Sequence, residues 1–352
     1  MLLEPSLRRR AWGGDRLESL RPTALHEPGS GPFGESWELA DLDRTGSSFG
    51  DRTTIARGCG AGRSVHEVLA EHRSALLGRG EPRSSGFPLL LKLLDAASPL
   101  SVQSHPSPEY AGENPGADVK HEGWFVMAAS PGAVVYRGFR RHLDRSEIRE
   151  AVATGRLHEE LVAEPVTAGD FIWLPSGTCH ALGGGLLVAE VQTPSDTTYR
   201  VHDWGRSDPS RPLHLKEIAE AVEGTSAAEL PPIVHTRRAE PLRANGFRTW
   251  DLHRGERFSI ELIEADAGAS MPVVTDGSAV CWMLLEGSLS IEATAATIPD
   301  LECRGVATLL FPAFGVPQHA RASADSKWLR IRLADECERS IAWNSNSPGA
   351  RA

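Results

Sequence analysis

The chain has 352 residues, of which 40% are hydrophobic and 24% are charged, an ordinary balance for a globular protein with enough apolar material for a core. Its formal net charge of −10 argues against a nucleic-acid partner, because proteins that bind nucleic acid usually carry a basic surface. No apolar run is long enough to cross a bilayer, and the N-terminal MLLEPSLRRR lacks the apolar core of a signal peptide. The five cysteines form no Cys-x-x-Cys pair. We therefore expect a cytoplasmic protein with reduced thiols and no membrane contact.

Short apolar runs, separated by glycine and proline, fill most of the chain, which contains 34 Gly and 24 Pro. Runs of this kind are typical of β-strands joined by turns, so the sequence predicts a mainly β fold. The expected strands, in chain order, are 88–96, 100–105, 122–129, 133–139, 170–177, 186–193, 258–265, 279–287, 288–293, 307–313 and 327–334.

Helical patterns are few. Segment 64–77 begins with the capping-box pattern S-x-x-E, and Gly78 can end the helix. Residues 143–164 form one helix or two, depending on whether Gly155 breaks the segment. Segment 214–223 carries apolar residues at the spacing i, i+3, i+4 and i+7, which predicts an amphipathic helix.

Two distant segments share one pattern, which indicates an internal repeat. FIWLPSGTCHAL (171–182) and LLFPAFGVPQHA (309–320) both run from an apolar strand through a proline turn to His-Ala. Together with the linker-like GTSAAELPPIV near 224–234, this predicts two β-sandwiches or jelly rolls, with a few helices packed on the first. The predicted units are 1–230, 231–345 and a polar tail at 346–352.

Four polar side chains interrupt or adjoin the apolar strands of the first unit. Gln103 and His105 are two residues apart, so they face the same side of a strand, and Glu122 and His180 come from separate strands. Two imidazoles, a carboxylate and an amide can form the ligand shell of a divalent metal such as zinc. The alternative is a set of unrelated buried polar residues, because spacing alone is weak evidence among 13 histidines.

A second group of charged residues lies nearby in the sequence. Lys120 is two residues before Glu122, and Asp196 is four residues before Arg200, so each pair shares one face of an extended strand. The alternative for Asp196 and Arg200 is a surface ion pair of little energetic value. Lys92 interrupts the apolar run LLLKLLDA, either at a strand edge or held by a carboxylate or an anion.

Several longer stretches follow the motifs of a known family, in that family's order. They are WGG (12–14), GESWEL (34–39), PLLLKLLDAASPLSVQSHP (88–106), KHEGWFV (120–126) and PSGTCHALGGGLLVAEVQTPSDTTYRVHDWGR (175–206). On these motifs the chain resembles the cupin-type, zinc-dependent mannose-6-phosphate isomerases, and most closely their bacterial short form. LLEGSLSI and LLFPAFGVPQHA resemble the second cupin domain of that family. The resemblance covers nearly the whole chain and implies two cupin-type jelly-roll domains.

The resemblance also implies roles for nine residues and a cofactor. It implies one zinc ion per chain, since the second cupin domain has His319 but no matching set of ligands. It implies catalytic roles for Arg200, Lys120 and Asp196, and it places Ser101 and Arg206 near the substrate's phosphate, with Lys92 a further candidate contact. The implied metal ligands are Gln103, His105, Glu122 and His180.

The implied reaction is the reversible isomerisation of mannose 6-phosphate to fructose 6-phosphate through an enediol, with a small sugar phosphate as the only partner. Such a site needs a base near C2, positive charge for the developing oxyanion and a phosphate clamp. The base remains open among Lys120, Asp196 and a zinc-bound water. The sequence fixes neither the oligomeric state nor the preferred sugar phosphate.

Two other functions compete with the isomerase. Two histidines and one carboxylate also form the ligand triad of non-haem iron oxygenases, but Gln103 would close a position that oxygen needs, and an oxygenase has no general need for Lys120 and Arg200. A cupin that binds a sugar phosphate without catalysis is the other alternative, and it would be favoured if Arg200 or a ligand were replaced.

Overall fold

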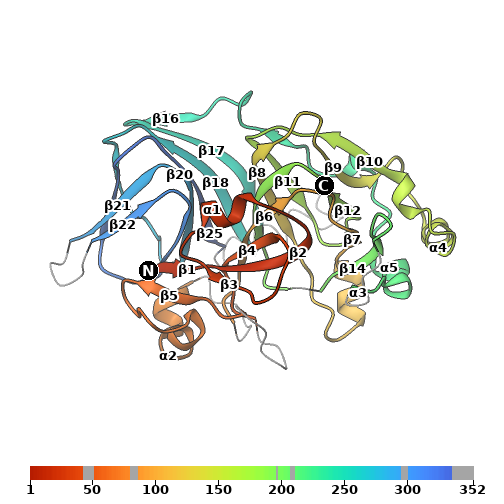
Figure 1. Cartoon of the computed structure of the whole chain (residues 1–352). Coiled ribbons are helices and arrows are strands. Elements are labelled where there is room, and N and C mark those ends of the chain that lie inside the picture. The colour runs from red at the N-terminus through yellow and green to blue at the C-terminus, as the bar shows by residue number, and fades with distance from the viewer. Residues whose placement is uncertain (43–50, 80–85, 196, 207–210, 295–299, 335–352) are drawn as a thin grey trace, which may run out of the picture.

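The computed structural model describes residues 1–42, 51–79, 86–195, 197–206, 211–294 and 300–334. The predicted polar tail and Asp196 lie outside the described residues. Over the described residues the fold is mainly β, as predicted, and its strands form four sheets that pack in pairs (Figure 1).

The first sandwich packs an eight-stranded sheet against a five-stranded one around Trp12, Trp124, Val135 and Leu182. The large sheet has the order β15 (Val234–His235), β11 (Asp170–Leu174), β8 (Glu122–Ala129), β13 (Leu186–Gln192), β6 (Leu90–Ala96), β4 (Phe33–Leu39), β2 (Ser6–Gly14) and β3 (Leu25–His26). The small sheet has the order β10 (Leu161–Pro165), β9 (Val134–Phe139), β12 (His180–Leu182), β7 (Val102–Ser104) and β14 (Tyr199–His202).

The second sandwich packs an eight-stranded sheet against a four-stranded one around Trp282, Trp328, Leu289 and Ala320. Its large sheet has the order β16 (Leu242–Ala244), β17 (Phe247–Arg254), β18 (Phe258–Ala265), β25 (Ser326–Leu333), β20 (Val280–Glu286), β23 (Ala307–Phe311), β1 (Leu2–Glu4) and β5 (Thr54–Arg57). Its small sheet has the order β19 (Ser270–Pro272), β24 (Gln318–Ala322), β21 (Ser288–Ala293) and β22 (Leu301–Arg304).

The two sandwiches repeat one strand order, which agrees with the internal repeat in the sequence. The run β11-β8-β13-β6-β4 of the first large sheet corresponds to β23-β20-β25-β18-β17 of the second. The small sheets correspond in the same way, β7-β12-β9-β10 with β19-β24-β21-β22. Nine strands of each sandwich therefore have a counterpart in the other.

The two large sheets face each other across a shared apolar core. Leu91, Leu93 and Val191 of the first sandwich belong to the same buried cluster as Ile260 and Ile331 of the second. Strands β6 and β13 are thus buried on both faces, which explains why their sequences are almost continuously apolar.

Two N-terminal strands cross to the second sandwich. β1 pairs with β23, with Leu2 opposite Leu309, and β5 pairs with β1. The division of the chain at 230/231 remains a proposal, and these two strands are exceptions to it. Leu2 and Leu309 are more than 300 positions apart in the sequence, so their pairing is decided by packing and not by a local pattern.

Five α-helices lie among the described residues. Helix α2 (Val65–Leu77) has the predicted capping box and ends at Gly78. The segment 143–164 forms two helical pieces, α4 (Arg145–Ala153) and the 3-10 turn η1 (Leu157–Glu160), separated around Gly155. The others are α1 (Arg16–Leu20), α3 (Pro108–Glu113), α5 (Leu215–Ala221) and a second 3-10 turn, η2 (Ala227–Glu229).

A few helices pack on the first sandwich, as predicted, but α2 does not. Residues of α4 and α5 share a buried cluster with the five-stranded sheet, through Ile148 and Ile218 against Val102. Helix α2 instead ends against the second sandwich, because the carbonyl groups of Leu76 and Leu77 accept hydrogen bonds from Ala313 and Ala279. Helix α2 follows β5 in the chain, and β5 belongs to the large sheet of the second sandwich, so the helix lies beside that sandwich.

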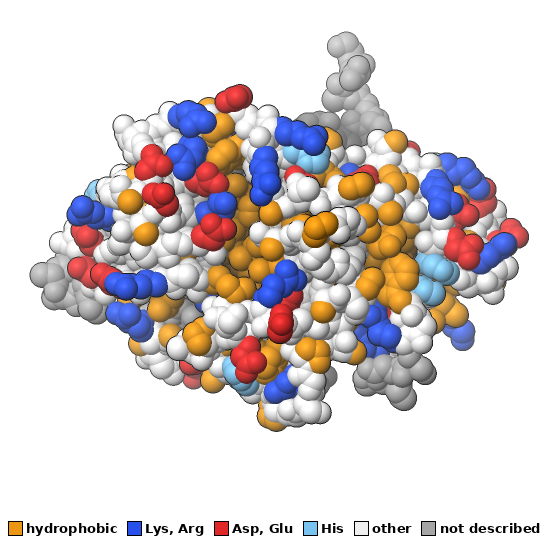
Figure 2. Space-filling view, turned by 45° about the horizontal axis from the view of Figure 1, so that its top comes forward, with side chains coloured by type: hydrophobic (Ala, Val, Ile, Leu, Met, Phe, Trp, Pro, Cys, Tyr) orange, Lys and Arg blue, Asp and Glu red, His pale blue; other side chains and the backbone are white. Residues whose placement is uncertain are grey.

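The surface carries charges of both signs. Lys, Arg, Asp and Glu side chains are interspersed over the face in Figure 2, and apolar side chains are densest over its middle. None of the helices in the described part of the chain is long and apolar enough to span a membrane.

A buried carboxylate connects the two large sheets. Glu38 of β4 is fully buried and accepts hydrogen bonds from Arg21 Nε at 2.9 Å and Ser36 Oγ at 2.6 Å. Its other oxygen accepts one from Thr308 Oγ1 of β23 at 2.8 Å. A buried charge needs such partners, so this network fixes how the two sandwiches meet.

We predict that Glu38→Ala lowers the free energy of unfolding by about 3–5 kcal/mol, because it leaves the Arg21 guanidinium buried without its partner. Thr308→Val is the matched control, which removes one hydrogen bond and is expected to cost about 1.5–3 kcal/mol. Urea unfolding of the purified variants measures both values. A loss below 1 kcal/mol for Glu38→Ala would show that the network does not hold the sheets together.

Candidate metal centre

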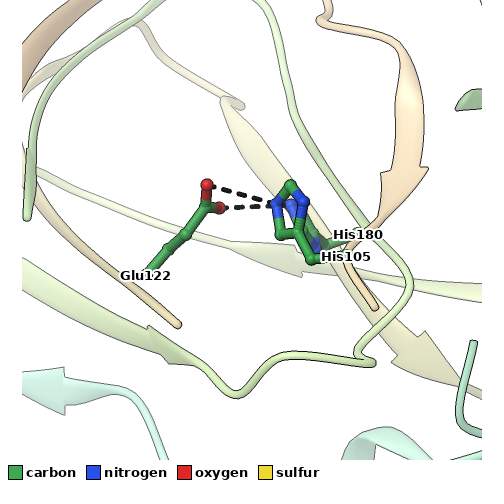
Figure 3. Close-up of side chains that lie close together, drawn as sticks. All are labelled: His105, Glu122 and His180. Carbon is green, nitrogen blue, oxygen red and sulfur yellow. Dashed lines mark ion pairs between the residues drawn. The ribbon is translucent and has the colours of Figure 1, made fainter. Parts of the chain in front are cut away.

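Three predicted ligands converge inside the first sandwich. Glu122 begins β8 on the large sheet, His180 begins β12 on the small sheet, and His105 follows β7. His105 Nε2 lies 3.2 Å from Glu122 Oε1, and His180 Nε2 lies 3.3 Å from Glu122 Oε2. The carboxylate faces both imidazole rings (Figure 3). Among the described residues, no other group of three or more His, Cys, Asp or Glu side chains is close enough to hold a metal ion.

Gln103 joins this group from β7. It is paired across the small sheet with His180, and its Nε2 lies 3.4 Å from His180 Nε2. Since the amide can be turned to present its oxygen instead, Gln103 can supply a fourth donor. All four predicted ligands are therefore brought together.

The three converging side chains leave buried polar atoms without hydrogen bonds. His105 Nε2 and Glu122 Oε2 are buried and have no hydrogen-bond partner among the described residues, and Glu122 Oε1 has none beyond its ion pair with Lys120. The other ring nitrogens are occupied, because His105 Nδ1 donates to Thr197 O and His180 Nδ1 donates to Thr178 O, each at 2.9 Å. Both Nε2 lone pairs consequently point toward the carboxylate, the arrangement in which imidazole binds a metal. The residues present fit a divalent cation.

The electrostatics of the centre favour ligand-ready protonation states. Burial alone would raise the pKa of Glu122, but the charge of Lys120 and the two histidines hold that pKa well below its usual range. Lys120 Nζ lies 2.7 Å from Glu122 Oε1. Burial, followed by the charge of Lys120, lowers the pKa of His105 to about 4. At neutral pH the site therefore presents a carboxylate and a neutral imidazole.

A cavity of about 370 Å³ opens beside the centre, and we call it the cationic cavity. Gln103 and Glu122 form part of its wall. Seven basic side chains line it against three acidic ones, in a protein of net charge −10. The basic lining residues are Arg8, Arg9, Arg10, Lys92, Lys120, Arg200 and Arg211. Such a local excess of positive charge attracts an anionic ligand.

Lys92 is held in the wall of this cavity by a carboxylate. Its Nζ lies 3.2 Å from Glu190 Oε2 on the adjacent strand β13 and donates to Gln192 Oε1 at 2.9 Å. Glu190 also accepts a hydrogen bond from Trp124 Nε1 at 2.9 Å, while its Oε2 has no hydrogen-bond partner among the described residues. Burial raises the pKa of Glu190, in spite of the charge of Lys92.

Arg200 and Ser101 also line the cationic cavity, as their predicted roles require. Arg200 comes from β14, and its buried Nε has no hydrogen-bond partner in the described part of the chain. Burial, followed by the charge of Arg211, lowers the pKa of Arg200. Ser101 Oγ accepts a long hydrogen bond from Arg211 Nη2, at 3.4 Å.

One predicted residue lies away from the cavity, and another falls outside the described residues. Arg206 is not part of its lining, and its guanidinium donates to Pro99 O at 2.7 Å and Asp203 Oδ1 at 2.6 Å. Asp196 lies outside the described residues.

Four further residues line the cavity and were not predicted: Arg10, Glu35, Glu190 and Arg211. Glu190 interrupts the apolar strand LLVAEVQ as Lys92 interrupts its neighbour, so the same signal was present. Arg10 pairs with Glu35 at 2.7 Å, and the charges of Arg10 and Lys92 hold the pKa of Glu35 well below its usual range, although burial opposes them. Arg211 lies in a polar stretch without any pattern that could have indicated a role.

The second sandwich lacks a corresponding set of ligands among its described residues. His319 of β24 pairs across to β19 and β21, as His180 of β12 pairs to β7 and β9. His319 is nevertheless exposed, whereas His180 is buried. Val280 stands at the first position of β20, where β8 has Glu122.

The chain is similar in sequence to phosphomannose (mannose-6-phosphate) isomerases. The family model described as the phosphomannose isomerase type I catalytic domain matches residues 1–132. The mannose-6-phosphate isomerase of Streptococcus mutans is 36% identical over 235 residues, which cover 66% of this chain and 70% of that protein. The mannose-6-phosphate isomerase ManA of Bacillus subtilis is 34% identical over 239 residues, covering 67% and 71%.

The fold is also similar to solved structures. The crystal structure of the mannose 6-phosphate isomerase from Bacillus subtilis has a TM-score of 0.78 and 25% identity, and the match covers 94% of this chain and 98% of that chain. A putative mannosephosphate isomerase from Archaeoglobus fulgidus, at 22% identity, has a TM-score of 0.69 and shares the fold, covering 95% and 98%.

We predict that His180→Ala weakens the binding of divalent cations by more than about 100-fold, since loss of even an outer partner of a ligand costs about 10–100-fold. Titration of the chelator-treated protein with Co²⁺, followed by its visible absorption, measures the change. His142→Ala is the control, because His142 is exposed and remote from the centre. Equal affinities in the two variants would rule out the proposed centre.

Proposed function

The chain belongs to the mannose-6-phosphate isomerase family, and from that premise we propose that it interconverts mannose 6-phosphate and fructose 6-phosphate in the cationic cavity. The observation that carries this proposal is the contact between the two parts of the site. A buried His105–Glu122–His180 cluster adjoins a cavity in which basic side chains outnumber acidic ones. A sugar phosphate is the kind of ligand that such a cavity selects, because it joins an anion to oxygens that a metal can hold.

We propose zinc as the metal, with one ion per chain. Gln103, His105, Glu122 and His180 would hold it, since imidazole, carboxylate and amide donors suit zinc and keep a position for substrate. When bound, the ion would act as a Lewis acid on the sugar oxygens at C1 and C2. The limit of one ion follows from the second sandwich, whose described residues contain no such group.

Arg200 is the proposed stabiliser of the enediolate. Isomerisation removes the proton at C2 and returns one at C1. Between these two steps, negative charge develops on the carbonyl oxygen of the sugar. The guanidinium remains positively charged and lines the cavity, with a buried Nε that forms no hydrogen bond to the described residues. A substrate oxygen can satisfy this donor.

Lys120 is one proposed base for the proton at C2, because its side chain lines the cavity beside Glu122. Its Nζ lies 2.7 Å from Glu122 Oε1. A specific observation also favours Glu190 as the base. Burial raises the pKa of this carboxyl group in spite of the charge of Lys92, whose Nζ lies 3.2 Å from Oε2, and this oxygen accepts no hydrogen bond from the described residues. Asp196 remains a third candidate on the resemblance alone.

Ser101, Arg211 and Lys92 are the proposed contacts to the phosphate. The hydroxyl of Ser101 and the guanidinium of Arg211 are 3.4 Å apart on one wall of the cavity, so a phosphate oxygen can bind both. Arg206, which the resemblance places at the phosphate, is bonded to Pro99 and Asp203 and would instead hold the loop that follows β14.

The proposed cellular setting is the cytoplasm. The four cysteines among the described residues are free thiols, and three of them are buried. This pattern agrees with a reducing compartment. The proposed partner is a small sugar phosphate, and neither nucleic acid nor a membrane is expected.

We predict that the purified protein with zinc converts mannose 6-phosphate and that Arg200→Ala reduces kcat by about 10²–10³-fold, as loss of an oxyanion donor does. A dehydrogenase that consumes fructose 6-phosphate reports the rate. Arg149→Ala is the control, since Arg149 forms an exposed ion pair with Glu220 far from the cavity. Near-normal turnover by Arg200→Ala would contradict the assigned role.

We further predict different effects from two arginines close together in the sequence. Arg211→Gln is expected to raise KM for mannose 6-phosphate by about 10–100-fold, because a hydrogen bond to a charged group contributes about 1.5–3 kcal/mol. Arg206→Gln is expected to change KM by less than about threefold, since its guanidinium does not line the cavity. Steady-state kinetics of both variants decide between them, and the reverse order would restore Arg206 as the phosphate contact.

A further inference from the structure

The second sandwich contains a polar cavity of about 280 Å³, which we call the second cavity. Nine of its ten lining residues are polar or charged, and they include four arginines and three acidic residues. Its walls come from β17, β18 and β25, from the loop before β20, and from Arg79, which follows α2. Neither the proposed reaction nor the metal centre uses any of these residues.

The second cavity occupies the position that the cationic cavity has in the first sandwich. Trp124 lies opposite Glu190 where β8 pairs with β13, and Trp282 lies opposite Arg330 where β20 pairs with β25. The next strand continues the match, because Glu190 lies opposite Lys92 and Arg330 lies opposite Glu261. The two cavities therefore open at the same end of equivalent sandwiches.

The ion pair at this position is reversed in sign between the two sandwiches. In the first, Lys92 on β6 pairs with Glu190 on β13 at 3.2 Å. In the second, Glu261 on β18 pairs with Arg330 on β25 at 2.7 Å. The reversal removes the acceptor that serves Trp124, and the indole nitrogen of Trp282 accordingly has no hydrogen-bond partner among the described residues.

The arginines of the second cavity are arranged in two layers. Arg330 and Arg332 lie within it, with side chains only 17% and 21% exposed, and Arg332 pairs with Asp276 at 2.8 Å. Arg254 lies at the rim beside Asp251. The acidic partners Asp276 and Asp251 are 65% and 46% exposed. Arg332 also donates to the backbone carbonyl groups of Thr275 at 3.1 Å and Val274 at 3.4 Å, which hold its guanidinium in place. Exposed ion pairs are weak, so a ligand anion can displace the two carboxylates at small cost.

These features select a phosphorylated ligand. A guanidinium binds phosphate through two parallel hydrogen bonds, and two cavity arginines, Arg332 and Arg254, have exposed carboxylate partners that a ligand can replace. Ser259, Ser278 and Glu261 add hydroxyl and carboxylate groups that can bind sugar hydroxyls. The acidic residues do not form a metal-binding group, since the one such group among the described residues is at the first centre.

We propose that the second cavity is a non-catalytic binding site for a small sugar phosphate. The ligand would be of the same chemical class as the proposed substrate, but it would meet no metal ligands there, because Val280 replaces Glu122 and His319 is exposed. This proposal is based on the residues of the second cavity and on its place in the repeated fold. It does not depend on the reaction proposed for the cationic cavity.

The test is the number of ligands that the full chain binds. The probe is mannitol 1-phosphate, which has no carbonyl group to isomerise, and isothermal titration calorimetry at low ionic strength counts the sites. Two sites per chain are expected. Arg332→Gln and, at the rim, Arg254→Gln are each expected to weaken one site by at least tenfold and to leave kcat and KM for mannose 6-phosphate within twofold. Arg211→Gln is expected to weaken only the other site.

Two outcomes would overturn the proposal. One is a single site that Arg211→Gln removes, and the other is a pair of sites that neither Arg332→Gln nor Arg254→Gln affects. Circular dichroism of each variant verifies its fold, and Arg254 is 74% exposed, so its replacement leaves the core intact. The isomerase assay is independent of the count of sites, so absence of activity would refute the proposed function without deciding this one.

Discussion

A carboxylate buried between two sheets is the constraint on which the first sandwich depends. Glu122 is 1% exposed, and a charge at that depth is tolerated only when other groups compensate it. Lys120 supplies a positive charge, and His105 and His180 approach its two oxygens without forming hydrogen bonds to them. Folding thus leaves a set of donor atoms directed at one point, and a divalent cation completes what the protein alone leaves unsatisfied.

The second sandwich contributes to this site through the strands that both sandwiches bury. Lys92 and Glu190 face the cationic cavity, while their neighbours Leu91 and Val191 face the apolar core shared with the second large sheet. Because side chains alternate along a strand, packing on one face sets the register and orientation of the polar groups on the other. The described residues of the second sandwich therefore support the site without supplying ligands to it.

Much of the candidate site could be predicted from polar residues within apolar strands. Gln103, His105, Glu122 and His180 converge as expected, because a side chain of that kind is rarely buried without a partner. Glu190 carried the same signal and was overlooked. Features set by distant contacts could not be predicted in this way, because no short-range pattern records them, and the pairing of β1 with β23 is one of these.

The sequence by itself determined what depends on a few neighbouring residues. The capping box of α2 and the alternation of apolar residues act over two to four positions, so the helix and most strands could be placed from the printed letters. Only the tertiary structure decided which of two nearby arginines reaches the cavity. Arg211 lines it, whereas Arg206 is bonded to Pro99 and Asp203. The physical reason is that the direction of a long side chain on a loop depends on the segments folded against it, and those segments are far away in the sequence.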